Sequence, residues 1–255
     1  MDNHRDELDL MAMQATLFEE GAHVVPGSRT FGPGANAFDV PLFNTLTIEL
    51  WGAGGGGSSI TALTVSASPG GAGGATSLSS LGLTAGGGGV DGAGKGGGAG
   101  GGAGGGTTNV AGGAGASGSI SGSTITQGAA GTCNGINGGN GFSVTLSSVG
   151  GSHCDSVNGG AASPGGGSSG CAFASTGTPS GDNFASGGGG GGYCRKVFTS
   201  VAALVKYQDV LSFVVGAGGT PGGAFDVTVA ATFGNGFHSI SGGAGGAGQI
   251  TFTWS

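Results

Sequence analysis

Four cysteines carry most of the potential for chemistry in this sequence. Cys133, Cys154, Cys171 and Cys194 are separated by 21, 17 and 23 positions and include no Cys-x-x-Cys pair, so their spacing is a poor match to a zinc site. His153 directly precedes Cys154, but neighbouring side chains on an extended chain point in opposite directions. The spacing therefore predicts no metal site. It leaves open whether the cysteines form disulfides, for which three pairings exist, or stay free thiols.

The histidines and the glycine motifs do not indicate an enzyme either. His23, His153 and His238 have no acidic or nucleophilic partner at a recognisable spacing, and we interpret them as loop or surface residues. The run Gly52–Gly57 follows a predicted strand and imitates the G-x-G-x-x-G motif of dinucleotide-binding proteins. No amphipathic helix follows this run to bind a phosphate at its N-terminus. We therefore expect a non-enzymatic protein without a cofactor.

Glycine dominates the elements that would have to position any functional residue. The chain has 68 glycines and 7 prolines among 255 residues, a composition typical of disordered or low-complexity chains. Charged residues make up only 7%, which argues against disorder. Ordering a glycine costs about 0.5–1 kcal/mol more than ordering an alanine, so close backbone contacts must offset that loss. We predict extended helices of the polyproline II type, with three residues per turn, packed side by side as polyglycine II.

Strand patterns flank the glycine. The stretch from Phe43 to Trp51 alternates apolar and polar residues, Val210–Val215 is apolar, and Gln249–Trp254 alternates again. We expect the last strand to pair with the first in one small sheet from which the glycine region projects. The predicted fold class is mostly β and irregular: a small β-sheet, a bundle of packed polyglycine II helices and a short N-terminal α-helix.

The longest glycine block, Gly94–Gly106, does not repeat with a period of three. Its Gly-Gly-Gly-Ala spacing is four, so Ala99 and Ala103 are expected at outer or loosely packed positions. We expect Gly101 and Gly105 to be interior glycines at which valine would prevent close backbone approach.

Residues 1–20 form a separate segment that we interpret as an N-terminal helical anchor. They contain six acidic residues and one basic residue, and their apolar residues recur at helical spacing. The acidic start argues against a signal peptide, and the sequence contains no apolar stretch near the ~20 residues needed to span a bilayer. The alternatives are that this helix folds back onto its own domain or that it docks on another protein. The residues expected to dock are Leu8, Leu10, Met11, Leu17 and Phe18.

Residues 21–37 are rich in Pro and Gly signals and are predicted to be a linker, with the glycine-rich domain extending over residues 38–255. Within that domain, polar insertions separate the glycine blocks and resemble loops between successive glycine rods. The insertions are Ser58–Pro69, Thr107–Val110, Ser117–Gln127, Phe142–Asn158 and Cys171–Phe184.

Aromatic residues near these insertions are the candidates for recognition, because a glycine rod presents only backbone. The candidates are Phe142, Phe173, Phe184 and Tyr193. The alternative is that these rings cover the edges of the glycine bundle as local core. Nucleic acid is an unsuitable partner, because the residues after position 20 carry seven acidic and five basic side chains and no basic cluster.

Several segments in their order resemble the glycine-rich domain of bacteriophage tail proteins. They are Phe38-Asp39-Val40-Pro41 followed by Ile48–Gly57, then Gly187–Tyr193, Val214–Gly219 and Gly242–Trp254. With its N-terminal segment, the chain is also similar to the receptor-binding adhesins that cap the long tail fibres of T-even-like phages, although its N-terminal region is much shorter. The resemblance implies a polyglycine sandwich whose distal loops recognise the host surface.

Three functions remain open at this stage. The first is a virion protein at a tail or fibre tip, present in multiple copies per particle, which docks to another virion protein and binds a protein or glycan receptor on a bacterium. The second is a structural virion decoration or tail component without receptor binding. The third is a secreted bacterial surface protein, although the sequence shows no export signal. None of the three requires insertion into a membrane.

Overall fold

The structure is a computed structural model, and the residues that it describes are 23–61, 66–90, 97–117, 119–121, 124–126, 128–134, 143–145, 164–168, 171–173, 187–200, 205–222, 225–228, 237–240 and 242–255. Within these ranges the chain is mostly β-strand and extended segments, and contains no α-helix. The predicted N-terminal helix, with Leu8, Leu10, Met11, Leu17 and Phe18, lies outside the described residues.

A five-stranded antiparallel sheet contains the strand formed by the first alternating stretch of the sequence. Its order is β1-β18-β3-β14-β9, formed by Gly27–Phe31, Gln249–Trp254, Thr45–Trp51, Tyr193–Thr199 and Thr108–Val110. The predicted pairing of the last strand with the first alternating strand is confirmed, because β18 pairs with β3 from Gln249 opposite Trp51 to Trp254 opposite Leu46.

A second five-stranded sheet has the order β2-β15-β6-β7-β8. It is formed by Gly34–Asp39, Val210–Val215, Thr76–Leu78, Leu83–Ala85 and Ala103–Gly104. A short 3₁₀ turn, Ser79–Leu81, connects β6 to β7 and ends at Gly82, whose φ of 66° suits glycine. The expectation of one small sheet is therefore wrong: the β region is built from two sheets.

The hydrophobic core contains side chains from both sheets. Alternation places Leu46, Ile48 and Leu50 of β3 fully inside, while Leu211, Phe213 and Val215 of β15 are buried from the second sheet. The rings of Phe38 and Phe252 stack with their centroids 4.2 Å apart, joining the two layers. The two five-stranded sheets therefore form a β-sandwich whose interior is filled with side chains, which the glycine-rich region cannot provide.

Two expectations about loops do not hold. Residues 21–37, predicted to be a linker, contain β1 and most of β2, which pair with β18 and β15 over their whole length. The Gly32-Pro33 signal marks only the turn between these two strands. Similarly, Thr107–Val110, predicted to be a loop between glycine rods, largely forms β9 at the edge of the first sheet.

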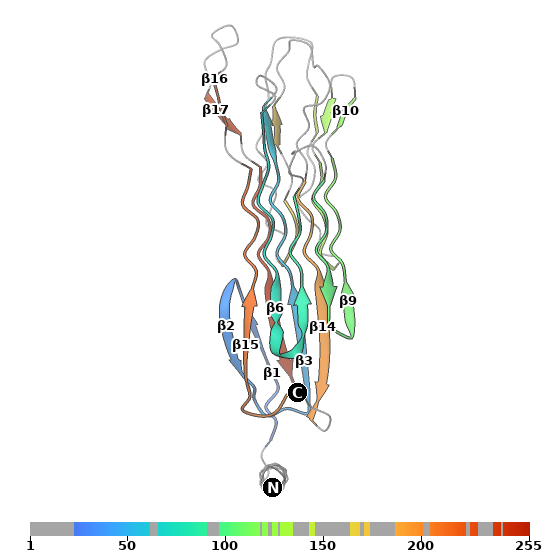
Figure 1. The fold of residues 1–255 in the computed structure, drawn as a ribbon, viewed down its shortest axis with the longest axis vertical. Helices are drawn as coiled ribbons and strands as arrows, with labels where there is room; N and C mark the ends of the chain where they lie inside the picture. Colours follow the sequence, from blue (N-terminus) through green and yellow to red (C-terminus); the bar gives the residue numbers. More distant parts are fainter. Residues whose placement is uncertain are drawn as a thin grey trace.

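Beyond the sandwich, the strands continue into extended glycine-rich segments that run along the long axis of the molecule (Figure 1). We call these segments the glycine core. They comprise residues 52–58, 69–75, 86–90, 97–102, 111–117, 128–134, 164–168, 187–192, 216–222 and 242–248.

Hydrogen bonds within the glycine core repeat every three residues. In segment 187–192, the N–H groups of Gly187 and Gly190 donate to segment 111–117, and those of Gly188 and Gly191 donate to segment 164–168. Gly189 and Gly192 donate to segment 86–90. Successive residues therefore point to three different neighbours, and each neighbour is reached again after three positions.

Segment 52–58 shows the same period. Gly52 and Gly55 donate to segment 187–192, Ala53 and Gly56 to segment 69–75, and Gly54 and Gly57 to segment 242–248. Both segments are buried along their described length, and both also accept hydrogen bonds from further segments. They form the centre of the glycine core.

Short strands lie at the end of the molecule opposite the sandwich. Figure 1 shows β10 (Ser119–Ser121), β16 (Phe225–Thr228) and β17 (Phe237–Ile240) there, whereas the C-terminus lies at the sandwich end. β10 pairs with β11 (Thr124–Thr126) and β12 (Ser143–Thr145), and β16 pairs with β17. A third small sheet has the order β13-β4-β5, formed by Cys171–Phe173, Ser59–Thr61 and Ser66–Ser68.

Candidate binding surfaces

The structure describes two of the four predicted recognition residues, Phe173 and Tyr193, and places them in different sheets. Phe142 and Phe184 lie outside the described residues. Phe173 ends β13, where its backbone lies opposite Thr61 of β4 in a parallel pair. Tyr193 begins β14 in the sandwich sheet, at the point where segment 187–192 enters it. The described part of the chain therefore assembles no aromatic cluster from these four residues.

Tyr193 does not fit a receptor contact. Its side chain is only 5% exposed, and its ring lies 5.2 Å from that of Trp51 on β3. Its hydroxyl donates a hydrogen bond of 2.5 Å to Glu49 Oε1. Burial, and then the bond to the Glu49 carboxylate, raises the pKa of Tyr193 well above its ordinary value. Its environment is that of a structural residue, so Tyr193 is not among the receptor contacts proposed below.

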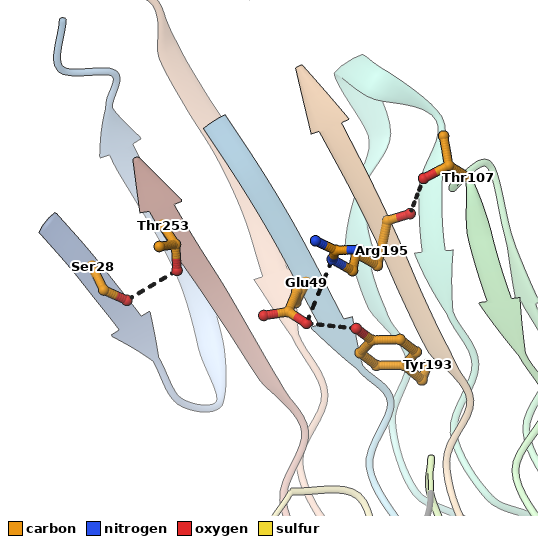
Figure 2. Close-up of polar contacts among 6 residues, drawn as sticks. All are labelled: Ser28, Glu49, Thr107, Tyr193, Arg195 and Thr253. Atoms are coloured by element: carbon orange, nitrogen blue, oxygen red, sulfur yellow. Dashed lines mark hydrogen bonds and ion pairs between the residues drawn. The ribbon is translucent and has the colours of Figure 1, made fainter. Parts of the chain in front are cut away.

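Glu49 is the centre of a small polar network on the outer face of the first sheet (Figure 2). It accepts from Tyr193, and Arg195 Nε lies 4.0 Å from Glu49 Oε1. On the other side of β14, Thr107 Oγ1 donates to the Arg195 carbonyl at 3.1 Å. The Arg195 side chain is 44% exposed, so its ion pair with Glu49 contributes little to stability.

Hydroxyl pairs continue this outer face toward β1. Ser28 and Thr253 lie 3.2 Å apart, oxygen to oxygen, and Thr30 and Thr251 lie 3.0 Å apart. Figure 2 shows the Ser28–Thr253 pair bridging β1 and β18. Cross-strand hydroxyl pairs of this kind stabilise sheets modestly and leave a polar, hydrated surface. The face offers hydrogen-bonding groups to a binding partner.

Two of the described cysteines have thiols enclosed by the protein. Cys133 and Cys194 are both free and fully buried. Burial raises the pKa of Cys133 to about 11 and also raises that of Cys194. Cys154 and His153 lie outside the described residues, and Cys171 begins β13. Among the residues that the structure describes, no group of three or more His, Cys, Asp or Glu could hold a metal ion.

Two buried hydroxyls were not anticipated from the sequence. Ser168 Oγ, deep in the glycine core, accepts from the Gly57 N–H at 2.6 Å and donates to the Gly243 carbonyl. Thr76 Oγ1 donates to the Trp51 carbonyl at 2.7 Å and accepts from the Gly216 N–H at 3.2 Å. Thr76 therefore links a strand end of one sheet to that of the other. Neither residue has a local sequence signal, because its partners are distant in the chain.

In the part of the chain that the structure describes, no helix has the length and apolar composition required to cross a membrane. Comparisons of the sequence and structure with protein-family models, with curated proteins and with solved structures give no match.

Proposed function

We propose that this chain is a non-enzymatic bacteriophage virion protein, a tail or tail-fibre adhesin that binds the host surface through the segments between its glycine rods. The observation that carries the proposal is the division of the molecule along its long axis. A sandwich with a side-chain core lies at one end, the glycine core follows, and short strands lie at the other end (Figure 1). Scaffolds that present variable segments at one end are typical of recognition proteins.

We further propose that the segments of the glycine core are polyglycine II helices. The three-residue period of their hydrogen bonds supports this, because polyproline II geometry has three residues per turn. Backbone contacts that are too close to admit a side chain support it as well. A Cβ on Gly189 would lie 1.9 Å from the Ala99 carbonyl oxygen, and one on Gly54 would lie 1.9 Å from that of Gly166.

Such a core suits an adhesin because it is held by backbone groups. Interior hydrogen bonds do not depend on the side chains of the connecting segments, so those segments can differ between relatives while the core stays the same. Phe142, Phe173 and Phe184 remain the proposed receptor contacts, since large aromatic side chains provide much of the binding energy at protein interfaces. The receptor would be a protein or a glycan on the bacterial surface.

The direct test is binding of the purified, fluorescently labelled chain to a panel of bacterial strains. We expect saturable binding to susceptible strains, competed by unlabelled chain and absent for heat-unfolded chain. Treating the cells with protease or with periodate distinguishes a protein receptor from a glycan. If no strain binds saturably while the chain is present on assembled particles, the adhesin function is wrong.

We propose that residues 1–20 dock the chain to another virion protein. Deleting them is expected to leave a folded sandwich that no longer joins its particle, and replacing Leu10, Met11, Leu17 and Phe18 is expected to weaken incorporation. Truncating one buried Leu or Phe at a docking face commonly costs about 2 kcal/mol or more. Incorporation of the truncated chain at full occupancy would contradict this anchor.

The second candidate is a structural virion component without receptor binding. The burial of Tyr193 favours it, because one of the four aromatic candidates is committed to the sandwich. Electron microscopy of particles with and without the chain separates the two functions: a decoration changes particle structure or stability but leaves host adsorption unchanged.

A further inference from the structure

A groove of about 690 Å³ lies at the sandwich end, where the described chain begins. Its lining includes Val25, Pro41, Leu42 and Tyr207, with His23 and Asp39 as its ionisable side chains. Val25 is 75% exposed and Tyr207 is 38% exposed, so both present apolar atoms to solvent beside the groove. The groove is therefore an apolar surface that the described residues leave uncovered.

The backbone around this groove is firmly held. The Trp254 indole Nε1 donates to the Val25 carbonyl at 2.9 Å, and the same ring packs against Gly27, where a Cβ would lie 2.5 Å from it. On the other side, Gln208 N–H donates to the Val40 carbonyl at 3.0 Å, and Lys206 N–H donates to Asp209 Oδ2 at 2.6 Å. Gln208 is kept at a φ of 69°, which is costly for a residue with a side chain.

This turn presents Tyr207 beside the groove in a fixed position. A rigid apolar groove binds with less loss of conformational entropy than a flexible one, because its lining is already ordered. Its features are those of a docking surface for an apolar segment.

We propose that this groove receives the chain's own N-terminal segment, with Met11, Ala15 and Phe18 as the residues that enter it. This segment is the favoured occupant because a short stretch of chain connects it to the groove. His23 lines the groove, so the five residues from Phe18 to His23 can span up to about 17 Å, and Phe18 cannot leave the neighbourhood of the groove. A tether this short gives an effective concentration in the millimolar range.

Composition supports the same occupant. Leu8, Met11, Ala15 and Phe18 recur at three- and four-residue steps, which matches the way an amphipathic helix fills an apolar groove. Lys206 directly precedes the lining residue Tyr207 in the chain and has the opposite charge to Glu19 and Glu20, while Asp39 is the one acidic side chain in the lining that opposes them. A glycine surface alone would offer no such groove, but the sandwich does.

The contact has a consequence for assembly that rests on the proposed docking to a virion partner. Met11 and Phe18, which are in both sets of contact residues, cannot contact the groove and a partner at once, so the partner must displace the segment. Weakening the groove therefore increases incorporation into particles, whereas removing the segment abolishes it.

The test is photo-crosslinking of the full chain with p-benzoylphenylalanine in place of Phe18, on a mixture of isotopically labelled and unlabelled chains. We expect crosslinks within one chain, mapping by mass spectrometry to residues 23–25, 39–42 and 207–208. Val25→Asp is expected to lower their yield about tenfold, because a charge now lies in the groove. Val214→Asp is the matched control: Val214 is also an exposed valine, at 49%, on the outer face of the second sheet, and its substitution leaves the yield unchanged.

Crosslinks between labelled and unlabelled chains would show that a second copy occupies the groove and would overturn the proposal. Scattered crosslinks, or none, would overturn it as well. Hydrogen exchange provides a second measurement: peptides covering residues 23–27 and 205–210 are expected to exchange faster in a chain lacking residues 1–20. These measurements use the free protein, so their failure is distinguishable from failure of the particle-docking assay.

Discussion

Gly101 and Gly102 are adjacent in the chain but have different surroundings. A Cβ on Gly101 would lie 2.1 Å from the Gly86 carbonyl oxygen, whereas a Cβ on Gly102 would meet nothing within 4 Å. Gly101 is buried and Gly102 is exposed. The requirement for glycine in this segment therefore changes from one residue to the next, because each residue of an extended three-residue turn points in a different direction.

These two residues give a matched pair of alanine substitutions. Gly101→Ala is expected to destabilise the protein by about 1–3 kcal/mol, because the backbone of segment 86–90 would have to move. Gly102→Ala is expected to be neutral or to stabilise by up to about 1 kcal/mol, because it restricts the unfolded chain without a native clash. Thermal or denaturant unfolding measures both. Equal effects would mean that the close approach at Gly101 is absent in solution.

Because the pKa of Cys133 is raised by burial, we expect the protein to lose stability at alkaline pH. Its pKa is about 11 in the folded chain against an ordinary value of 9.0, so between these values the unfolded chain loses a proton that the folded chain keeps. The unfolded state is then favoured, and the free energy of unfolding falls as the pH rises from about 9 to about 11. The contribution is fully present below pH 9.

The measurement is the free energy of unfolding against pH for the natural chain and for Cys133→Ala. Cys194 and Tyr193 also have raised pKa values, so only the difference between the two curves reports on Cys133. We expect the natural chain to have the steeper fall. Parallel curves would show that the Cys133 thiol is accessible to water, as would rapid reaction with iodoacetamide in the folded state.

At the scale of elements, the three-residue repeat of the hydrogen bonds determines how many residues can be inserted into a glycine segment without breaking them. In segment 187–192, residues three positions apart donate hydrogen bonds to the same neighbouring segment, and consecutive residues donate to different segments. Inserting one glycine between Gly189 and Gly190 would turn one end of the segment by about a third of a turn relative to the other. The N–H groups on one side of the insertion would then face the wrong neighbours, at a cost of about 1–3 kcal/mol for each group left unpaired.

Inserting three glycines at the same place preserves these directions and shifts the segment by about 9.3 Å, one full turn. We therefore expect the single insertion to lower the melting temperature far more than the triple insertion. Circular dichroism during heating is a sufficient measurement. A penalty that simply grew with the number of inserted residues would contradict the three-residue repeat.

At the scale of the whole molecule, the sandwich and the glycine core provide stability, and recognition is proposed for the chain between the glycine rods. Exchanging Phe142–Asn158 and Cys171–Phe184 for the corresponding segments of a related protein with another host range is expected to change adsorption. The melting temperature and particle assembly are expected to stay the same, because the core bonds are between backbone groups outside these segments. Unchanged host range in the exchanged particles would favour the structural virion component.

How much of this protein could be predicted from sequence depends on whether a signal is local. The alternation in Thr45–Trp51 and Gln249–Trp254 predicted two strands and their pairing, because a period of two is readable in any short stretch. The spacing of alanines correctly placed Ala99 at an exposed position, but Ala103 lies in β8 and packs against the hydrophobic core. The clash that a Cβ at Gly101 would make agrees with the predicted interior position of Gly101. Gly105 is exposed, with a φ of 81°, and is not interior. The predicted close backbone approach is nevertheless present, because a Cβ there would lie 2.0 Å from the Gly82 carbonyl oxygen.

The candidate site was less predictable than the fold, because the burial of a residue depends on neighbours that are far away in the sequence. Nothing near Tyr193 in the sequence shows that Trp51 and Glu49 enclose it, and nothing near Ser168 or Thr76 shows their partners across the core. The groove is equally non-local, since it combines Val25, Leu42 and Tyr207 from separate parts of the chain.

By itself, the sequence determined that this chain would combine regular strands with close-packed glycine backbone, because side-chain size and alternation act locally. Only the tertiary structure decided that two sheets form instead of one and that residues 27–39 belong to them. It also decided which glycine segments are neighbours. Glycine runs look alike in sequence, and their partners are selected by where the flanking strands enter the sandwich, through hydrogen bonds between residues far apart in the chain.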